Sequence, residues 1–494
     1  MRFPSESRAL ARAIADPPSV PDVRPQSDLV GLDRRAVRPE DLLANSVAVI
    51  APAASALSVP FVLMRVVGPG AWLSAVLGFG LALLLAAVFS QFATRIAAAG
   101  SMYTWVTRSL GPFAGLLVGT SMLLGYGILV AFGISQAIRR SSEAVTTGSP
   151  DGVAVDAWSQ WWIGIAAIAV CLLVSVRGVR VATRLALVVE SALVVGLLLL
   201  VALTITREGL PSASVLSLEG ADPGRIVLGA TVVMGITVGF ESAAALAGEA
   251  ERPFWSVPRA MTGAVLVAAV LYALGFLAAN APLVAGDHRR GPAQRWFPDS
   301  VDVHVADAIL SSLLALSFLA LALCAWNALA RVIFSLAREG ALPASLGRAH
   351  ARWGSPVAAL AVVTPFAIAP ATVTLLLGRE VGELSMTLLR SAVLVLIVAY
   401  ALVALALPVF LVRIDEVTPG PVAVAALAVV LTITLATLDT VEDVRQGDRG
   451  GLVLTAATLA GGVLWFVWLR SHRRRALRRM GIHDETITTD LLGP

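Results

Sequence analysis

The chain has 494 residues, of which 57% are hydrophobic and 14% are charged, and its mean hydropathy is +0.83. This composition is typical of a membrane protein and excludes a soluble enzyme. The formal net charge is +4 and the pI is about 9.6, and all of the basic residues apart from histidine are arginine, because the chain has no lysine.

Long apolar segments recur along the whole chain. A helix needs about 20 apolar residues to cross a bilayer. Twelve segments are long enough, and an even number of spans places both termini on one side of the membrane. They begin near Leu42, Ala71, Leu110, Ala157, Leu185, Ile226, Ala260, Ala308, Gly354, Ser391, Pro421 and Gly450.

The arginines indicate which side that is, because cytoplasmic flanks collect basic residues. With both termini cytoplasmic, 25 of the 37 arginines fall inside and 12 outside. Arg34, Arg35 and Arg38 precede the first span, and the run 473–475 follows the last. We therefore expect a multi-pass protein of the cell (inner) membrane with both termini cytoplasmic. The excess of arginines is then explained by membrane topology rather than by nucleic-acid binding.

The two ends of the chain differ from the apolar middle. Residues 1–40 are polar and rich in proline and lack the apolar stretch of a cleaved signal peptide, which predicts a disordered cytoplasmic leader. Residues 41–470 form the predicted membrane domain, and residues 471–494 a cytoplasmic tail. Cys171 and Cys324 lie in separate spans, so neither a disulfide nor a metal site is predicted, and no cofactor is expected.

Two of the twelve spans are interrupted. Pro52 and small residues break the first, and Gly235 and Gly239 weaken the sixth. Interrupted segments at matching positions of two halves indicate a transporter built from inverted repeats, with its site near the middle of the bilayer. The repeats would cover about 41–206 and 226–412, and the last two helices about 421–469.

Glu241 lies inside the sixth span, directly after its glycines. A carboxyl group at membrane depth is costly, and unwound backbone is tolerated there only against protein or a water-filled cavity. The segment around Glu241 is therefore where we expect a substrate site.

Three stretches together resemble amino acid permeases of the amino acid, polyamine and organocation superfamily. They are residues 99–112 (AGSMYTWVTRSLGP), residues 239–253 (GFESAAALAGEAERP) with the following Val-Pro-Arg259, and residues 331–343 ending in AREGALP. The resemblance implies an all-α membrane protein with twelve transmembrane helices. It also implies a leucine-transporter-type five-plus-five inverted repeat, broken helices one and six, and alternating access.

The same resemblance implies a site made mostly of backbone groups. The free N–H groups at the start of a half-helix suit a carboxylate, and free carbonyls suit an amine. Phe240 would close over the ligand as an aromatic lid, or else be a packed core residue. The other substrate-binding residues implied are Ile50, Ala53, Ala54, Ser55 and Ala56 in the first span and Thr237 and Val238 in the sixth.

Two acids are candidates for proton coupling. Glu241 matches the family acid that responds to protonation, with a purely structural role as the alternative. Glu190 in the fifth span is the second candidate, with pairing to Arg180 or Arg184 as the alternative. The middle of the eighth span offers no hydroxyl for sodium, and the coupling lysine of some relatives is absent.

Charged residues at the cytoplasmic ends of spans six and eight form a candidate inner gate. Glu249, Glu251 and Arg252 at the end of span six would form ion pairs with Arg331, Arg338 and Glu339 at the end of span eight when the gate is closed, although solvated helix ends often carry such charges.

The predicted function is secondary active transport of amino acids or related amines, linked to protons or working by exchange. The alternatives are the same fold carrying a polyamine or an inorganic cation, and an amino acid sensor that does not transport. An intramembrane protease is disfavoured because all five histidines fall in loops or at span borders. The expected partners are therefore a small molecule, protons and lipid, with no nucleic acid.

Overall fold

The structure is a computed structural model, and it describes Leu32 and residues 35–148, 154–280, 296–297, 300–378, 381–445, 447 and 449–481. Twelve helices in this part are long and apolar enough to cross a membrane, which confirms the predicted number of spans. In chain order the elements are α2 (Pro39–Ile50), α3 (Pro52–Val66), α4 (Ala71–Ala93), α5 (Met102–Leu110), α6 (Pro112–Gly148), α7 (Ala157–Val176), α8 (Val179–Glu208), η1 (Ala213–Leu216), α9 (Pro223–Thr237), η2 (Phe240–Glu249), α10 (Pro253–Ala279), α13 (Val303–Arg338), η3 (Ala344–Gly347), α14 (Val357–Leu377), α15 (Val381–Arg413), α16 (Pro419–Arg445), α17 (Gly450–His472) and α18 (Arg474–Arg479).

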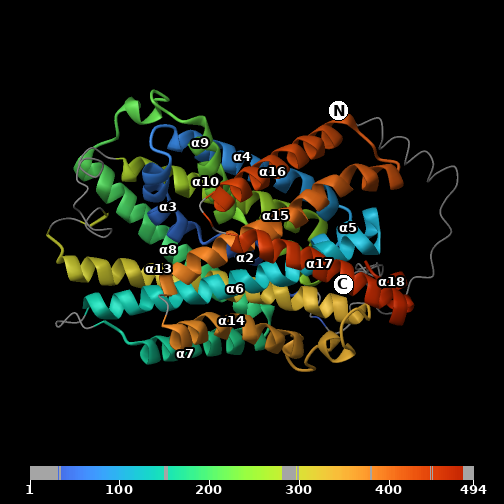
Figure 1. Cartoon of the computed structure of the whole chain (residues 1–494). Coiled ribbons are helices and arrows are strands. Elements are labelled where there is room, and N and C mark those ends of the chain that lie inside the picture. The colour runs from blue at the N-terminus through green and yellow to red at the C-terminus, as the bar shows by residue number, and fades with distance from the viewer. Residues whose placement is uncertain are drawn as a thin grey trace.

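The spans divide into central and peripheral helices. In α6 and in the α9–η2 span, 78% of the most apolar window is buried inside the protein, whereas in α16 and α17 only 17% is buried. Figure 1 shows α6 beside α13, and the red α17 on the outside of the bundle. The last two helices are therefore an outer addition, and the site lies among the central ones.

Exposed tryptophans mark the two ends of the bundle. We call the end where α2 begins and α17 ends the terminal face, and the other end the opposite face. Trp158 and Trp162 are about 60% exposed near the opposite face, and Trp255, Trp353 and Trp468 are 38–48% exposed near the terminal face. Tryptophan collects where headgroups meet hydrocarbon. These rings therefore indicate the level of the membrane surface at each end.

The first span breaks at Ala51, which has a left-handed backbone (φ 48°, ψ 59°) between α2 and α3. Pro52 follows it and is the first residue of α3. Proline has no N–H group, and its ring disfavours a helical conformation in the residue before it. The sequence therefore ends one helix and starts another within a single residue, as predicted.

The sixth span breaks at Val238 and Gly239 and continues as the 3₁₀ helix η2. Gly239 has φ 99°, and a Cβ atom there would lie 2.1 Å from Cγ1 of Val49. Two hydrogen bonds join η2 to α2: Asn45 Nδ2 donates to Ser242 Oγ (3.0 Å), and the Ala243 amide donates to Ser46 Oγ (3.2 Å). The two broken spans therefore hold each other.

Both ends of the chain pack on the terminal face as far as they are described. The Val37 amide donates to the Glu249 carbonyl (3.0 Å), and the Glu251 amide donates to the Val37 carbonyl (3.0 Å). Ala476, Met480 and Gly481 are buried. Residues 35–40 of the predicted leader and 471–481 of the predicted tail are therefore part of the folded structure. The remaining leader and tail residues, 1–31, 33, 34 and 482–494, lie outside the described residues.

We predict that Gly239→Ala destabilises the protein by roughly 2–4 kcal/mol, because it combines a left-handed backbone with an overlap against Val49. The measurement is the thermal unfolding midpoint of the purified protein in detergent. Gly80→Ala is the matched control, because Gly80 is exposed on α4 and its Cβ would meet no atom within 4 Å. Equal midpoints for the two variants would contradict the packing described for the sixth span.

Candidate functional site

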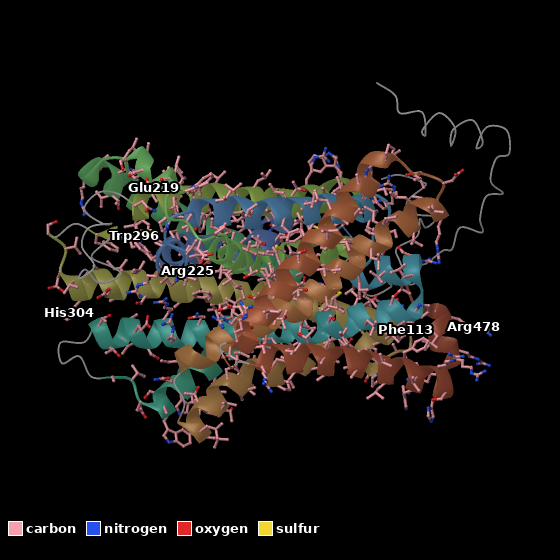
Figure 2. The ribbon with its side chains drawn as sticks, turned by 45° about the horizontal axis from the view of Figure 1, so that its top comes forward. Phe113, Glu219, Arg225, Trp296, His304 and Arg478 are labelled. Atoms are coloured by element: carbon pink, nitrogen blue, oxygen red, sulfur yellow. The ribbon has the colours of Figure 1, made fainter. Side chains whose placement is uncertain are left out.

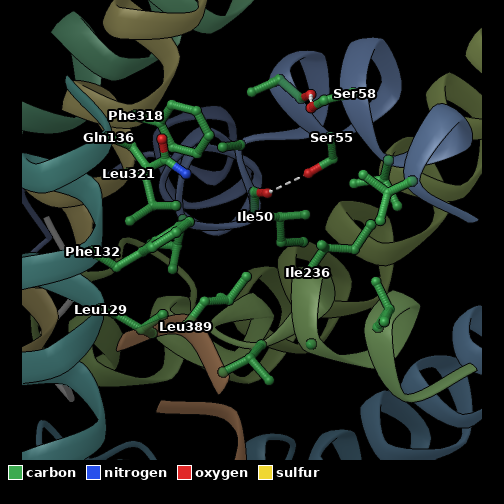
Figure 3. A pocket seen from close by; sticks show the side chains of 18 of the residues that line it. Ile50, Ser55, Ser58, Leu129, Phe132, Gln136, Ile236, Phe318, Leu321 and Leu389 are labelled. Carbon is green, nitrogen blue, oxygen red and sulfur yellow. Dashed lines mark hydrogen bonds between the residues drawn. The ribbon is translucent and has the colours of Figure 1, made fainter. Parts of the chain in front are cut away.

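A cavity of about 190 Å³ lies between the two broken spans. Figure 3 shows its lining side chains, which come from α2, α3, α6, α9, α13 and α15. Most of the wall is apolar, with Phe132 and Phe318 meeting edge to face at 5.6 Å. The cavity extends from the break at Ala51 to Val62, Arg139 and Arg140 near the opposite face.

Half of the substrate-binding residues predicted from the sequence line this cavity. Ile50, Ala54, Ser55 and Val238 face it. Ala53, Ala56 and Thr237 are buried and are not among the lining residues; Thr237 Oγ1 donates to the Met234 carbonyl (2.7 Å).

Phe240, the predicted aromatic lid, is fully buried and also lies outside the lining. Its ring stacks on Phe89 at 5.5 Å and lies 5.9 Å from the ring of Tyr400. In this conformation it is a core residue, and Phe132 and Phe318 supply the aromatic wall instead.

The polar groups of the cavity are mainly the ends of two helices. At the start of α3, the amide of the lining residue Ala54 has no acceptor within its own helix. At the end of α2, the Ile50 carbonyl accepts the Ser55 hydroxyl (3.3 Å), as the dashed line in Figure 3 shows. The break therefore brings the amide end of one helix and the carbonyl end of another to one place, which suits a molecule with both a carboxylate and an amine.

Charged and amide side chains surround the cavity near the opposite face. Arg139 Nε donates to Gln136 Oε1 (3.0 Å), and Glu143 accepts from Arg139 Nη1 (3.1 Å) and Arg140 Nη1 (2.9 Å). Neither Gln136 nor the two arginines was predicted as a site residue. Their position near the end of the third span gave no signal that they face the cavity.

Glu241 is fully buried behind the break and accepts three hydrogen bonds. The donors are the Tyr126 hydroxyl to Oε1 (2.8 Å), and the Tyr400 hydroxyl (2.6 Å) and the Gly239 amide (3.1 Å) to Oε2. The two tyrosines come from α6 and α15, so one side chain links the sixth-span break to two other helices. The sequence carried only a weak signal for these partners: a phenol inside an apolar span favours a polar neighbour, but none of the four tyrosines indicates which one.

Glu190 is buried on α8 and accepts fewer hydrogen bonds than Glu241. Its Oε1 accepts the Ser317 hydroxyl of α13 (3.3 Å), and its Oε2 has no hydrogen-bond partner within the described residues. Arg180, considered from the sequence as a partner, donates instead to the Ala36 carbonyl (3.0 Å). Ser317 was overlooked among the hydroxyls of the eighth span.

The predicted gate contains one buried ion pair. Arg331 Nε and Nη2 donate to the two carboxylate oxygens of Glu249 at 2.6 and 3.2 Å, and the two side chains are 0% and 2% exposed. Arg331 Nη1 also donates to the Asn327 carbonyl (3.0 Å), and Asn327 Nδ2 donates to Ser175 Oγ (2.9 Å). Arg252 and Arg338, two of the other predicted members, are exposed and are not part of this pair.

A second carboxylate lies beside the gate pair on the terminal face. Glu339 is buried, accepts the Tyr103 hydroxyl and accepts the Gly481 amide at 3.0 Å. The tail therefore fastens the end of α13 to α5. With Glu249 and Arg331 paired as well, this face is packed shut while the cavity extends toward the opposite face.

Comparison with known proteins identifies this architecture. The family model described as amino acid permease matches residues 43–448. The chain belongs to the amino acid permease family. This assignment confirms the resemblance found in the three sequence stretches.

Two individual matches agree with the assignment. The chain is 28% identical over 306 residues to the branched-chain amino acid permease BcaP of Lactococcus lactis subsp. cremoris strain MG1363, over 58% of this chain and 64% of that protein. It therefore spans somewhat less than two thirds of that relative. It is also similar in structure to Mhp1, a nucleobase-cation-symport-1 family transporter solved in a closed conformation with bromovinylhydantoin bound. The TM-score is 0.54 at 14% identity, over 91% of this chain and 99% of Mhp1, which confirms the predicted leucine-transporter-type fold.

We predict that Glu249→Leu lowers the stability of the permease by roughly 3–5 kcal/mol, because Arg331 is left buried and charged without a partner. Replacing both residues, as Glu249→Leu with Arg331→Met, should restore most of this loss. Thermal unfolding of the purified protein is the measurement. Arg445→Met is the control, since that side chain is 74% exposed and its removal should cost less than about 1 kcal/mol. A double variant no more stable than the single one would contradict the pairing.

Proposed function

We propose that this permease is a secondary active transporter of neutral amino acids with apolar side chains, working by alternating access. The observation that carries the proposal is the cavity at the first-span break. There the start of α3 at Ala54 and Ser55 and the end of α2 at Val49 and Ile50 lie beside a largely apolar wall. A zwitterion with a branched aliphatic side chain matches both halves of this lining.

The size of the cavity agrees with a small substrate. Its volume is about 190 Å³. An engineered apolar cavity on the order of 150 Å³ holds benzene, so an amino acid of moderate size fits. The similarity to a branched-chain amino acid permease supports the same class of substrate.

The side chains that line the cavity disfavour a polyamine or an inorganic cation as the substrate. Its charged members are Arg139 and Arg140, and no acidic side chain is among the lining residues that the structure describes. A polyamine needs carboxylates or many carbonyls to offset its charge, and an inorganic cation needs several oxygens.

Alternating access accounts for the asymmetry between the two faces. The terminal face is packed shut by the Glu249–Arg331 pair and by Glu339, and the cavity extends toward the opposite face. We propose that the terminal face is cytoplasmic in the cell membrane, which the excess of arginines on that side supports. The conformation described is then outward-facing.

We further propose that transport is linked to protons through Glu241 and Glu190. An ionised Glu241 accepts from Tyr126, Tyr400 and Gly239 together. A protonated carboxyl group becomes a donor at one oxygen, so one of these bonds has to rearrange and the sixth-span break loosens. Glu190 has an oxygen without a partner within the described residues, which supports a second place for a proton.

We predict that Ser55→Leu reduces amino acid uptake about tenfold or more, because the larger side chain occupies the cavity beside the start of α3. The measurement is uptake of labelled leucine into vesicles containing purified protein, with unlabelled valine and isoleucine as competitors. Ser312→Leu is the matched control, since Ser312 is exposed on α13 away from the cavity. If Ser55→Leu transports at the wild-type rate, the substrate does not bind at the first-span break. If the wild-type protein takes up no neutral amino acid, the proposed function itself is wrong.

We predict that Glu241→Gln removes most of the pH dependence of transport. Uptake by the wild type should rise as the external pH is lowered, because proton-coupled transport follows the inward proton gradient. Glutamine imitates the neutral carboxyl group, so uptake by the variant at high pH should approach its value at low pH.

Initial uptake rates at imposed external pH measure this effect. Glu190→Gln is measured in parallel to weigh the second site, and Glu219→Gln, an exposed change between α8 and α9, is the control. An unchanged pH profile in Glu241→Gln would show that Glu241 serves only to hold the break.

A further inference from the structure

A second cavity lies on the terminal face, far from the substrate cavity. Its volume is about 440 Å³, and it lies where α5 turns into α6, against the ends of α17 and α18. Three arginines, Arg470, Arg474 and Arg478, share its lining with Phe113 and Phe466. Figure 2 shows Phe113 and Arg478 close together at one end of the bundle.

The three arginines give this cavity a strong positive charge. Within the described residues none of their guanidinium groups pairs with a carboxylate. Arg474 Nε donates to the Arg470 carbonyl (3.0 Å), across the junction of α17 and α18. Three neighbouring cations repel one another, so an anion between them is stabilising. Guanidinium groups suit phosphate in particular, because each can donate two parallel hydrogen bonds.

The other half of the lining is apolar. The rings of Phe113 and Phe466 meet edge to face at 5.2 Å, and Leu110 and Leu477 complete this side. Phe113 is 44% exposed, so its ring is open to contact with a hydrocarbon chain. A free inorganic anion would use the arginines and leave this surface in water.

The depth of the cavity matches the membrane surface. Trp468 is 44% exposed and lies two residues before Arg470 on α17. Its ring stacks with His472, and the Arg473 guanidinium lies 5.4 Å from the ring centre. Tryptophan at this position indicates the headgroup level. The arginines therefore lie among headgroups, and the two phenylalanines lie at the start of the acyl chains.

We propose that this cavity binds one anionic phospholipid, with the phosphate held by Arg470, Arg474 and Arg478 and an acyl chain along Phe113 and Phe466. Basic pockets between helices at this level are suited to such headgroups. The bound lipid joins α6 to α17 and α18, and α18 leads directly to Gly481 and the closed terminal face.

The test is native mass spectrometry of the full-length protein in detergent, titrated with phosphatidylglycerol or with phosphatidylcholine. We expect the wild type to retain one phosphatidylglycerol in preference to phosphatidylcholine. The double variant Arg470→Gln/Arg474→Gln should retain it about tenfold less. The matched control is Arg475→Gln/Arg479→Gln, which removes the same charge from α18 at positions that do not line the cavity.

Two further arms decide the alternatives. Phe113→Ser should weaken retention of phosphatidylglycerol, whereas competing inorganic phosphate should not displace the lipid. Equal losses in the two arginine variants would mean general attraction to an anionic surface and would overturn the proposal. Displacement by inorganic phosphate together with wild-type retention in Phe113→Ser would mean an anion site without a lipid and would also overturn it. Gel filtration of each variant shows that it is folded.

Discussion

The rest of the structure depends on the need of every backbone N–H and C=O group inside a membrane to find a partner. A continuous helix meets this need alone, so a break exposes groups that are costly unless something binds them. This permease has two breaks side by side, at Ala51 and at Val238–Gly239, and ties them together through Asn45, Ser46 and Ser242. The groups left over at the first break face the cavity. In the proposed function, the backbone groups that make the break costly are the same groups that bind the zwitterion.

The sixth-span break is held differently, because a side chain replaces the missing backbone partners. Glu241 is two residues beyond Gly239, accepts its amide, and reaches Tyr126 and Tyr400 on two other helices. A buried carboxylate is expensive, and these donors offset part of that cost. The proposed coupling follows from the same bonds, since a change in the charge of Glu241 alters the forces that position η2. Structural and functional roles of this acid are therefore two descriptions of one network.

The sequence predicts the architecture well and the site less completely, for a physical reason. Span length, the positions of Pro52 and Gly239, and the offset between the two breaks depend on local chemistry, and each is found where it was predicted. Glu249 and Arg331 were predicted because they occupy equivalent ends of neighbouring spans. Tyr126, Tyr400 and Ser317 were missed as partners, because which face of an apolar helix points inward depends on packing, and a membrane span carries little amphipathic signal. Phe240 shows the same limit, since its neighbours in the chain say nothing of Phe89.

The proposed gate, the buried Glu249–Arg331 ion pair, has physical properties that suit a moving part. Taking Arg331 and Glu249 out of water costs about as much as their attraction returns, so such a pair adds little net stability compared with apolar packing. The pair nevertheless favours one closed arrangement, because either charge buried without the other is strongly unfavourable. Opening the face lets water reach both groups, and hydration then replaces the lost attraction. A closure made only of packed leucines would be harder to open, because nothing in the open state would offset the exposed surface. On the proposed alternating-access mechanism, an ion pair at this position would keep the closed and open states close in free energy, within the range over which substrate and proton binding can shift the balance.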